Sequence, residues 1–406
     1  MARPVFMNSK QVKLSLCLLT LANVYHYPSV AHAAQWNMKP SVTGYFFYDD
    51  NLQLTDQEEV TTGGSFVTAA ADFNRKTETS HLGGIIKIDD RRYYDLQSIN
   101  STDTFLDLTA NKQYERLVYA LAANYTRDTT ITSELEGTGS IQTVRDRTSY
   151  SIQPGFTYKP SEISSITFNY SYQDIDYDAL ASEFTDYTYE TISFLYDYQW
   201  NQKTGFQVQL SSSEYEAPDI GFAGIASVTS ETLTDSAMLG LSHQFNERTA
   251  FSILVGRRES KKKTIFPGVF SLLNTSSKDD GGIYTATLDY YFLNGQINTR
   301  ASREVTPVGN GAINISDKLD ASLGWRFTAR DRASFNMLYI ETKPDTANSS
   351  TSERQYYQFS PKYIRELSRE WSMDVGYQYR RQHYRGQQDK PDSNRLFLSL
   401  QYQWQR

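Results

Sequence analysis

The feature that most constrains the fold is a strict alternation of apolar and polar residues in segments as long as a membrane-spanning strand. In the clearest segment, residues 163–173, the apolar and aromatic members alternate with polar ones: Ile166, Phe168, Tyr170 and Tyr172 against Thr167, Asn169, Ser171 and Gln173. Successive side chains of a strand point to opposite faces, so the segment has one apolar face and one polar face. No apolar run is long enough for a membrane helix. Repeated and closed on itself, this pattern predicts an all-β fold, a transmembrane antiparallel up-and-down β-barrel with lipid outside and water inside.

The first residues predict export from the cytoplasm. Three basic residues precede a short apolar stretch at 14–22, and Ala31-His32-Ala33 has the small-x-small form of a cleavage site. We therefore expect residues 1–33 to be a cleaved signal peptide and residues 34–406 to form a single barrel in the bacterial outer membrane. Cys17 is the only cysteine. The mature chain is thus expected to lack disulfides and thiolate chemistry.

Turn and loop signals set the expected number of strands. Eight short, charged turns alternate with nine longer loops, which lie near residues 51–64, 92–102, 127–147, 174–186, 216–230, 260–282, 304–316, 343–352 and 384–393. Each long loop closes one outward-and-return pair, which predicts about 18 strands. The first strand should start near Val42, and the last, residues 396–404, should pair with it. A soluble β-sandwich or solenoid, the alternative, would need shorter strands.

Charged residues on the polar phase are the candidates for a solute path through the barrel. By this phasing the inward-facing charges are Lys87, Asp107, Asp197, Asp289, Arg300, Lys318, Asp320, Arg326, Lys362, Asp374 and Arg380. From Arg300 onward the chain holds 17 basic and 12 acidic residues, although the net charge of the whole chain is −7. We expect Arg300, Arg326, Lys362 and Arg380 to face water and form a basic sector that attracts anions. The alternative is a generic solvated lumen with cross-strand ion pairs.

Sites for enzymatic or metal chemistry are not evident in the sequence. The acidic run Asp174, Asp176 and Asp178 lacks the Gly and Glu that a calcium-binding loop needs, since Ala179 and Thr185 stand there. We expect no enzymatic activity and no cofactor. The basic run at 261–263 is too short to indicate nucleic-acid binding and suggests a solvated rim or contacts to lipopolysaccharide phosphates.

The opening segment Gly44-Tyr45-Phe46-Phe47-Tyr48-Asp49-Asp50-Asn51-Leu52 resembles the first strand of the β-barrel porin type 2 group, which includes barrels of exopolysaccharide-biosynthesis systems. The resemblance implies an outer-membrane barrel that assists export of a capsule or biofilm polysaccharide, alongside a periplasmic polysaccharide-export protein. Its partners would then be outer-membrane lipid, lipopolysaccharide and the polymer.

Two other functions remain open on the sequence. One is a diffusion porin for small molecules, which would narrow its lumen with a loop folded inward; the candidate loops are residues 127–147 and 260–282. The other is a structural or adhesive barrel that acts through its external loops.

Overall fold

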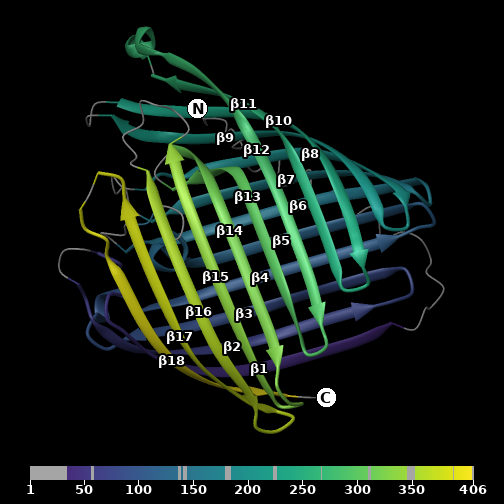
Figure 1. Ribbon diagram of the computed structural model, residues 1–406. Helices are drawn as coiled ribbons and strands as arrows, with labels where there is room; N and C mark the ends of the chain where they lie inside the picture. Colours follow the sequence, from purple (N-terminus) through teal and green to yellow (C-terminus); the bar gives the residue numbers. More distant parts are fainter. Residues whose placement is uncertain are drawn as a thin grey trace, which may run out of the picture.

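The computed structural model describes residues 34–55, 59–135, 139, 144–178, 184–222, 226–266, 268–309, 312–344, 353–386 and 388–404, so the predicted signal peptide lies outside the described residues. These residues form a barrel of 18 strands (Figure 1). The strands are β1 (Gln35–Asp49), β2 (Thr62–Lys76), β3 (Ser80–Tyr93), β4 (Ser101–Gln113), β5 (Leu117–Thr129), β6 (Asp146–Ser161), β7 (Ser164–Tyr177), β8 (Tyr187–Asn201), β9 (Thr204–Phe222), β10 (Ala226–Asn246), β11 (Thr249–Ile265), β12 (Thr275–Phe292), β13 (Gly295–Val308), β14 (Ala312–Arg326), β15 (Asp331–Pro344), β16 (Arg354–Glu366), β17 (Trp371–Tyr384) and β18 (Asp392–Gln403). Among the residues that the structure describes, three short helical segments lie in the connections: η2 (Gln97–Ile99), α2 (Thr130–Ser133) and η3 (Gly268–Leu273). Among the described residues no helix is both long enough and apolar enough to cross a bilayer.

Every strand pairs antiparallel with its sequence neighbours, and β1 pairs with β18 to close the sheet. The closing register joins Ser41 to Gln403 and Asp49 to Arg395. Closure satisfies the backbone hydrogen-bonding groups that an open sheet edge would expose to lipid. The predicted barrel and its strand number are confirmed, although β1 begins at Gln35, earlier than the predicted start near Val42.

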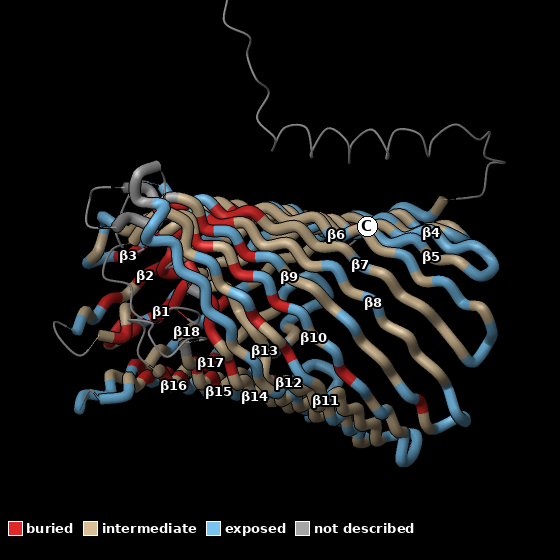
Figure 2. Tube along the Cα trace, turned by 90° about the horizontal axis from the view of Figure 1, so that it is seen from above, coloured by how far each residue is buried: buried red, intermediate tan, exposed pale blue. Residues whose placement is uncertain are grey.

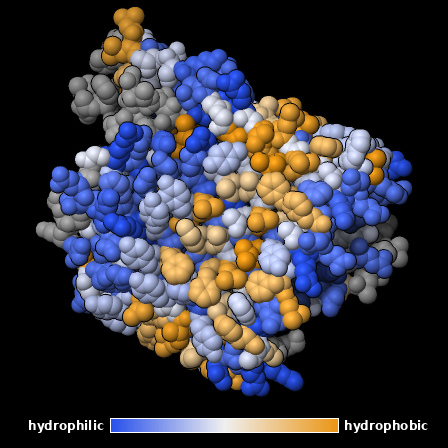
Figure 3. Space-filling model, viewed as in Figure 1, coloured by the Kyte–Doolittle hydropathy of each residue, from blue (hydrophilic) through white to orange (hydrophobic). Residues whose placement is uncertain are grey.

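Alternate side chains divide the wall into an outer apolar face and an inner polar face. On β18, Leu396, Leu398 and Leu400 are exposed on the outside, and they alternate with Arg395, Phe397 and Ser399. Figure 3 shows apolar side chains gathered across the middle of the visible wall, with hydrophilic ones toward both ends. An apolar band of this kind suits the hydrocarbon core of a membrane, and the chain is an outer-membrane type of barrel.

Several strands run farther than the sequence predicted. Residues 260–265 and 275–282, predicted as parts of one long loop, belong to β11 and β12. β9 and β10 likewise extend through much of the predicted loop at 216–230, and β13 and β14 through most of that at 304–316. Asp174 and Asp176, predicted to lie in an acidic loop, belong to β7. Polar residues continue these strands because backbone hydrogen bonds to a neighbouring strand do not require apolar side chains.

The two ends of the barrel differ in how they are filled. Seven of the nine connections that follow odd-numbered strands are longer than any that follows an even-numbered strand, and we call their side of the barrel the loop end and the other side the turn end. Buried residues gather toward the loop end, whereas the turn end is mostly exposed (Figure 2). The interior of the barrel therefore has a packed region near the loops and a more open region near the turns.

Candidate functional site

Two inward-folded loops fill much of the lumen at the loop end. The β1–β2 loop contributes Leu52 and Leu54, which are 2% and 0% exposed, and the β5–β6 loop contributes Ile131 and Leu135. They pack in one apolar cluster against inward-facing residues of the wall, namely Phe47, Tyr93, Ile340 and Tyr356. We call the described residues of these two loops, 50–55, 59–61, 130–135, 139 and 144–145, the loop plug. Burying each leucine contributes about 1.5–3 kcal/mol, which stabilises the inward position of the loops.

The β1–β2 loop is held by polar side chains of β17. Arg380 is 4% exposed; its Nη2 lies 2.8 Å from Asp49 Oδ2 and donates weakly to the carbonyl oxygens of Asn51 and Leu52, each at 3.4 Å. Gln382 Nε2 donates to the carbonyl oxygen of Leu54 at 2.6 Å. Leu54 has a φ of 55°, a strained conformation for a side chain with a Cβ, and these contacts hold it in place.

Arg380 corrects one sequence prediction. It points inward as predicted, but it does not face water, because the loop plug covers it. Its charge is matched by Asp49, which is 0% exposed and also accepts from Arg395 Nε at 2.7 Å and from Ser393. Arg380 is therefore part of the anchor of the loop plug, not of a basic sector in the open lumen.

The β5–β6 loop crosses to the far wall. Arg354 Nη2 on β16 donates to the carbonyl oxygen of Leu135 at 2.7 Å, and β16 lies seven strands away from β5 around the wall. On the near side, Arg91 on β3 donates to Thr132 at 3.0 Å. Glu134 accepts from Tyr177 at 2.7 Å and lies 3.4 Å from Arg147 Nε. Of the two segments predicted to fold inward, 127–147 does so at its described residues Ile131 and Leu135, whereas the described residues of 260–282 mostly belong to the ends of β11 and β12.

A second contact joins the β7–β8 and β13–β14 connections. Thr185 N donates to the carbonyl oxygen of Gly309 at 2.7 Å, and the Tyr215 hydroxyl to that of Val308 at 3.5 Å. An apolar cluster surrounds the contact and contains Ile175, Tyr177, Phe184, Tyr187, Tyr215, Ala217 and Ile313. The loop end is thus narrowed by a second packed region in addition to the loop plug.

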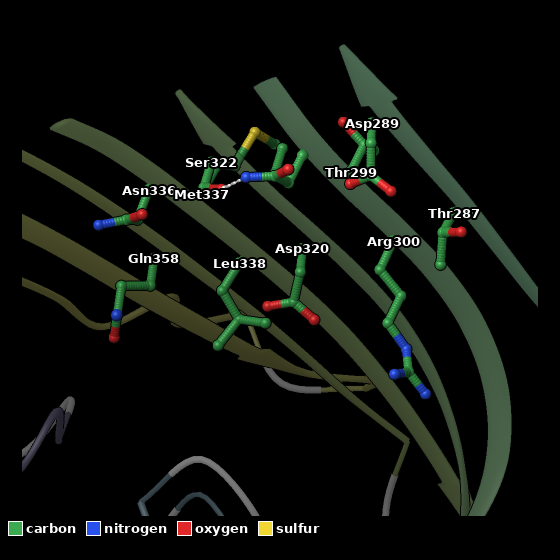
Figure 4. Close-up of a pocket in the computed structure, with 12 residues that line it drawn as sticks. Thr287, Asp289, Thr299, Arg300, Asp320, Ser322, Asn336, Met337, Leu338 and Gln358 are labelled. Carbon is green, nitrogen blue, oxygen red and sulfur yellow. Dashed lines mark hydrogen bonds between the residues drawn. The ribbon is translucent and has the colours of Figure 1, made fainter. Parts of the chain in front are cut away.

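Beyond the loop plug, the inner face of β12–β16 carries charged and amide side chains around a hollow of about 500 Å³. One cross-strand row contains Thr287, Arg300, Asp320, Leu338 and Gln358, and it continues to Arg380 beneath the plug. Figure 4 shows Arg300, Asp320, Leu338 and Gln358 extending in the same direction from neighbouring strands. Arg300 and Asp320 are exposed to the lumen. Among the described residues, neither forms an ion pair within 4.0 Å.

The other predicted lumen charges lie on the inner face but differ in their partners. Lys362 lies 3.4 Å from Asp374, Lys318 lies 3.7 Å from Glu304, and Lys87 lies 3.0 Å from Asp89. Asp197 accepts from Gln207 Nε2 at 2.7 Å, and Asp289 lines the hollow beside Arg300. Arg326 is exposed at the turn end, directly opposite Arg332 in the sheet register. Cross-strand ion pairs therefore occur at Lys362 and Lys318, with partners on neighbouring strands, whereas Lys87 pairs within β3 and Arg300 and Arg326 are exposed.

The inner face of β5–β9 and its neighbour β10 is different in character. At mid-depth it carries mainly hydroxyl and amide side chains, which hydrogen-bond across strands: Asn124 with Ser151 at 3.0 Å, Thr157 with Thr167 at 2.9 Å and Ser211 with Ser236 at 2.6 Å. We call this the neutral wall, and the inner face of β12–β16 the charged wall. A solute in the lumen lies between the two.

The residues that anchor the plug were not among those predicted from the sequence. Arg354 and Gln382 are each 2% exposed and donate to loop carbonyl groups. The sequence signal that could have indicated an inward-folded loop was its apolar content. Solvated loops are mostly polar, whereas these two contain Leu52, Leu54, Ile131 and Leu135. Within the described part of the chain, no three His, Cys, Asp or Glu side chains are grouped so that they could hold a metal ion.

Comparisons with known proteins find solved barrels but no family. No family model and no curated protein matches the chain. Among solved structures, the chain is similar to Acinetobacter baumannii OccAB4, with 9% identity, coverage of 93% of this chain and 100% of that one, and a TM-score of 0.43. It is also similar to OmpTΔL8, a loop-deletion mutant of an outer membrane protein of Vibrio cholerae (12% identity, 92% and 100% covered, TM-score 0.39). A third is the open form of the ferric-catecholate import receptor Fiu from E. coli K12 (8% identity, 90% and 81% covered, TM-score 0.46). Likeness at this level carries no argument about function, and the resemblance to the β-barrel porin type 2 group stays a prediction.

Proposed function

We propose that this barrel is a size-limited diffusion channel for small polar solutes in the outer membrane. The observation that carries the proposal is the described part of the β5–β6 loop, which leaves β5 and reaches the opposite wall, where Arg354 on β16 donates to the carbonyl oxygen of Leu135. A loop fixed across the lumen narrows the path without closing the open region that lies toward the turns. The polar groups of the two walls replace water around a passing solute.

The same observation argues against the passage of a polymer through the barrel at rest. An extended polysaccharide would have to pass beside two packed apolar clusters at the loop end. Exopolysaccharide export, with a periplasmic export protein as partner, therefore needs the plug to move and stays a prediction. Deleting the gene tests it directly: loss of surface polymer with unchanged uptake of small solutes would favour export over diffusion.

Reconstituted protein gives the sharper test. We expect liposomes that contain the barrel to swell quickly in small neutral sugars and progressively more slowly from mono- to di- to trisaccharides. Replacing residues 130–135 by Gly and Ser should flatten this dependence on size, because it removes the apolar side chains of Ile131 and Leu135 that pack inside the barrel. Arg354→Ala, which removes the donor to Leu135, should have a smaller effect in the same direction.

The matched control is Arg385→Gln. Arg385 stands on the rim after β17, its side chain is 76% exposed, and it pairs with Glu353 at 2.7 Å without touching the plug. The control should retain the size dependence of the wild type. Equal rates for mono- and trisaccharides in the wild type, or a size limit unchanged by the replacement of residues 130–135, would refute the proposal.

A further inference from the structure

We infer that the charged wall holds a binding station for small carboxylates that bear a hydrogen-bond donor on the neighbouring carbon, such as α-hydroxy or α-amino acids. This inference rests on the proposed function and names the solute class. The station consists of Arg300, Asp320, Leu338 and Gln358, which form one row across β13, β14, β15 and β16.

The charges of the station are available to a solute. Arg300 and Asp320 stand directly opposite each other in register, which places the Cβ atoms of such neighbours about 4.5–5.5 Å apart. Both side chains are exposed to the lumen, and among the described residues neither has an ion-pair partner. Most other inner-face charges near them are matched, as in the pairs Lys318–Glu304 and Lys362–Asp374. An unmatched guanidinium beside an unmatched carboxylate offers a donor pair and an acceptor at one place.

Each side chain of the station can bind a different chemical group of the solute. The guanidinium of Arg300 can bind a carboxylate in a bidentate manner. The carboxylate of Asp320 can accept a hydrogen bond from a hydroxyl or ammonium group one carbon away. Leu338 provides the apolar surface beside them, and Figure 4 shows it between Asp320 and Gln358. A carboxylate without the neighbouring donor would satisfy Arg300 alone.

The station also lies on the path of a solute that moves through the lumen. Gln358 accepts from the Tyr356 hydroxyl at 2.8 Å, and Tyr356 is 1% exposed in the cluster that supports the loop plug. The station therefore adjoins the narrowed part of the lumen. A second hollow of about 570 Å³ lies on the same wall at the turn end; its lining includes Arg332, which pairs with Glu366 at 3.4 Å, and the exposed Arg326, which would attract the same anions.

Lactate and propionate, which differ by one hydroxyl group, are the probes. Their binding to the purified barrel in detergent is measured by saturation-transfer NMR, and their block of the potassium chloride current in planar bilayers is measured separately. We expect lactate to bind more tightly than propionate. Arg300→Gln should weaken both by about fivefold, the range of an exposed ion pair. Asp320→Ala should remove the preference for lactate while propionate binding persists.

The matched control is Arg257→Gln, because Arg257 lies on β11 with its side chain 84% exposed and outside the station. It should leave both ligands unaffected. Equal binding of lactate and propionate to the wild type, or unchanged binding in Arg300→Gln, would overturn the station even if the pore conducts. A barrel that binds lactate selectively but passes neither current nor solute would keep the station and refute the diffusion channel instead.

Discussion

Arg380 and Arg300 share a position in the sequence pattern and differ in what the fold does with them. Both lie on the inner face of C-terminal strands, in the same cross-strand row. Arg380 is covered by the loop plug and paired with the fully buried Asp49, whereas Arg300 is exposed to the lumen. The position of an inward-facing arginine along the barrel axis thus determines whether it forms a buried ion pair or is exposed to solutes in the lumen.

The largest expected effect comes from the buried member of this comparison. Arg380→Gln leaves Asp49 with Arg395 and Ser393 but removes one of its two cationic partners, and it weakens the hold on the β1–β2 loop. Loss of one partner from a buried pair costs about 3–5 kcal/mol. We expect a lower free energy of unfolding by urea in detergent micelles.

The double variant Asp49→Asn with Arg380→Gln sharpens this prediction. If the lost Arg380–Asp49 ion pair causes the destabilisation, the double variant should lose less free energy of unfolding than the two single variants lose in sum, because it leaves no unpaired charge. Additive effects would show that Arg380 acts through its contacts with the loop carbonyl groups alone.

The sequence could predict which of these side chains face the lumen, but not how far along the barrel axis each of them lies. Alternation fixed which side chains point inward, and the tight turns fixed the number of strands. Burial of Arg380 depends on where Leu52 and Leu54 pack, which is a contact between residues more than 300 positions apart. The ends of β11 and β12 were missed for a different reason, since their charged residues resemble those of a loop while their backbones still pair.

An intermediate effect is expected at the charged wall. Neutralising Arg300, Arg326 and Lys362 together should shift the reversal potential under a potassium chloride gradient toward cation selectivity. Fixed charges act on ions within a Debye length of about 8 Å at physiological ionic strength. Neutralising Asp289, Asp320 and Asp374 should shift the potential in the opposite direction. Shifts of the same sign in both variants would show that the wall charges do not set selectivity.

The smallest effect is expected at the neutral wall. Ser151→Ala and Thr167→Ala remove hydroxyl groups that bond to Asn124 and Thr157, and they change no charge. The reversal potential should equal that of the wild type, and conductance should change little. A clear change in selectivity from these variants would contradict the division of the lumen into a charged and a neutral wall.

The most direct test compares the accessibility of two single cysteines in a chain produced without residues 1–33, which contains no other cysteine because Cys17 is removed. Leu52→Cys lies in the loop plug, where Leu52 is 2% exposed, and Asp320→Cys lies on the charged wall, where Asp320 is exposed. Their rates of reaction with a water-soluble thiol reagent are measured on the folded barrel. We expect fast labelling at position 320 and slow labelling at position 52. Equal rates at the two positions would contradict a lumen that is packed at the loop end and open to water toward the turns.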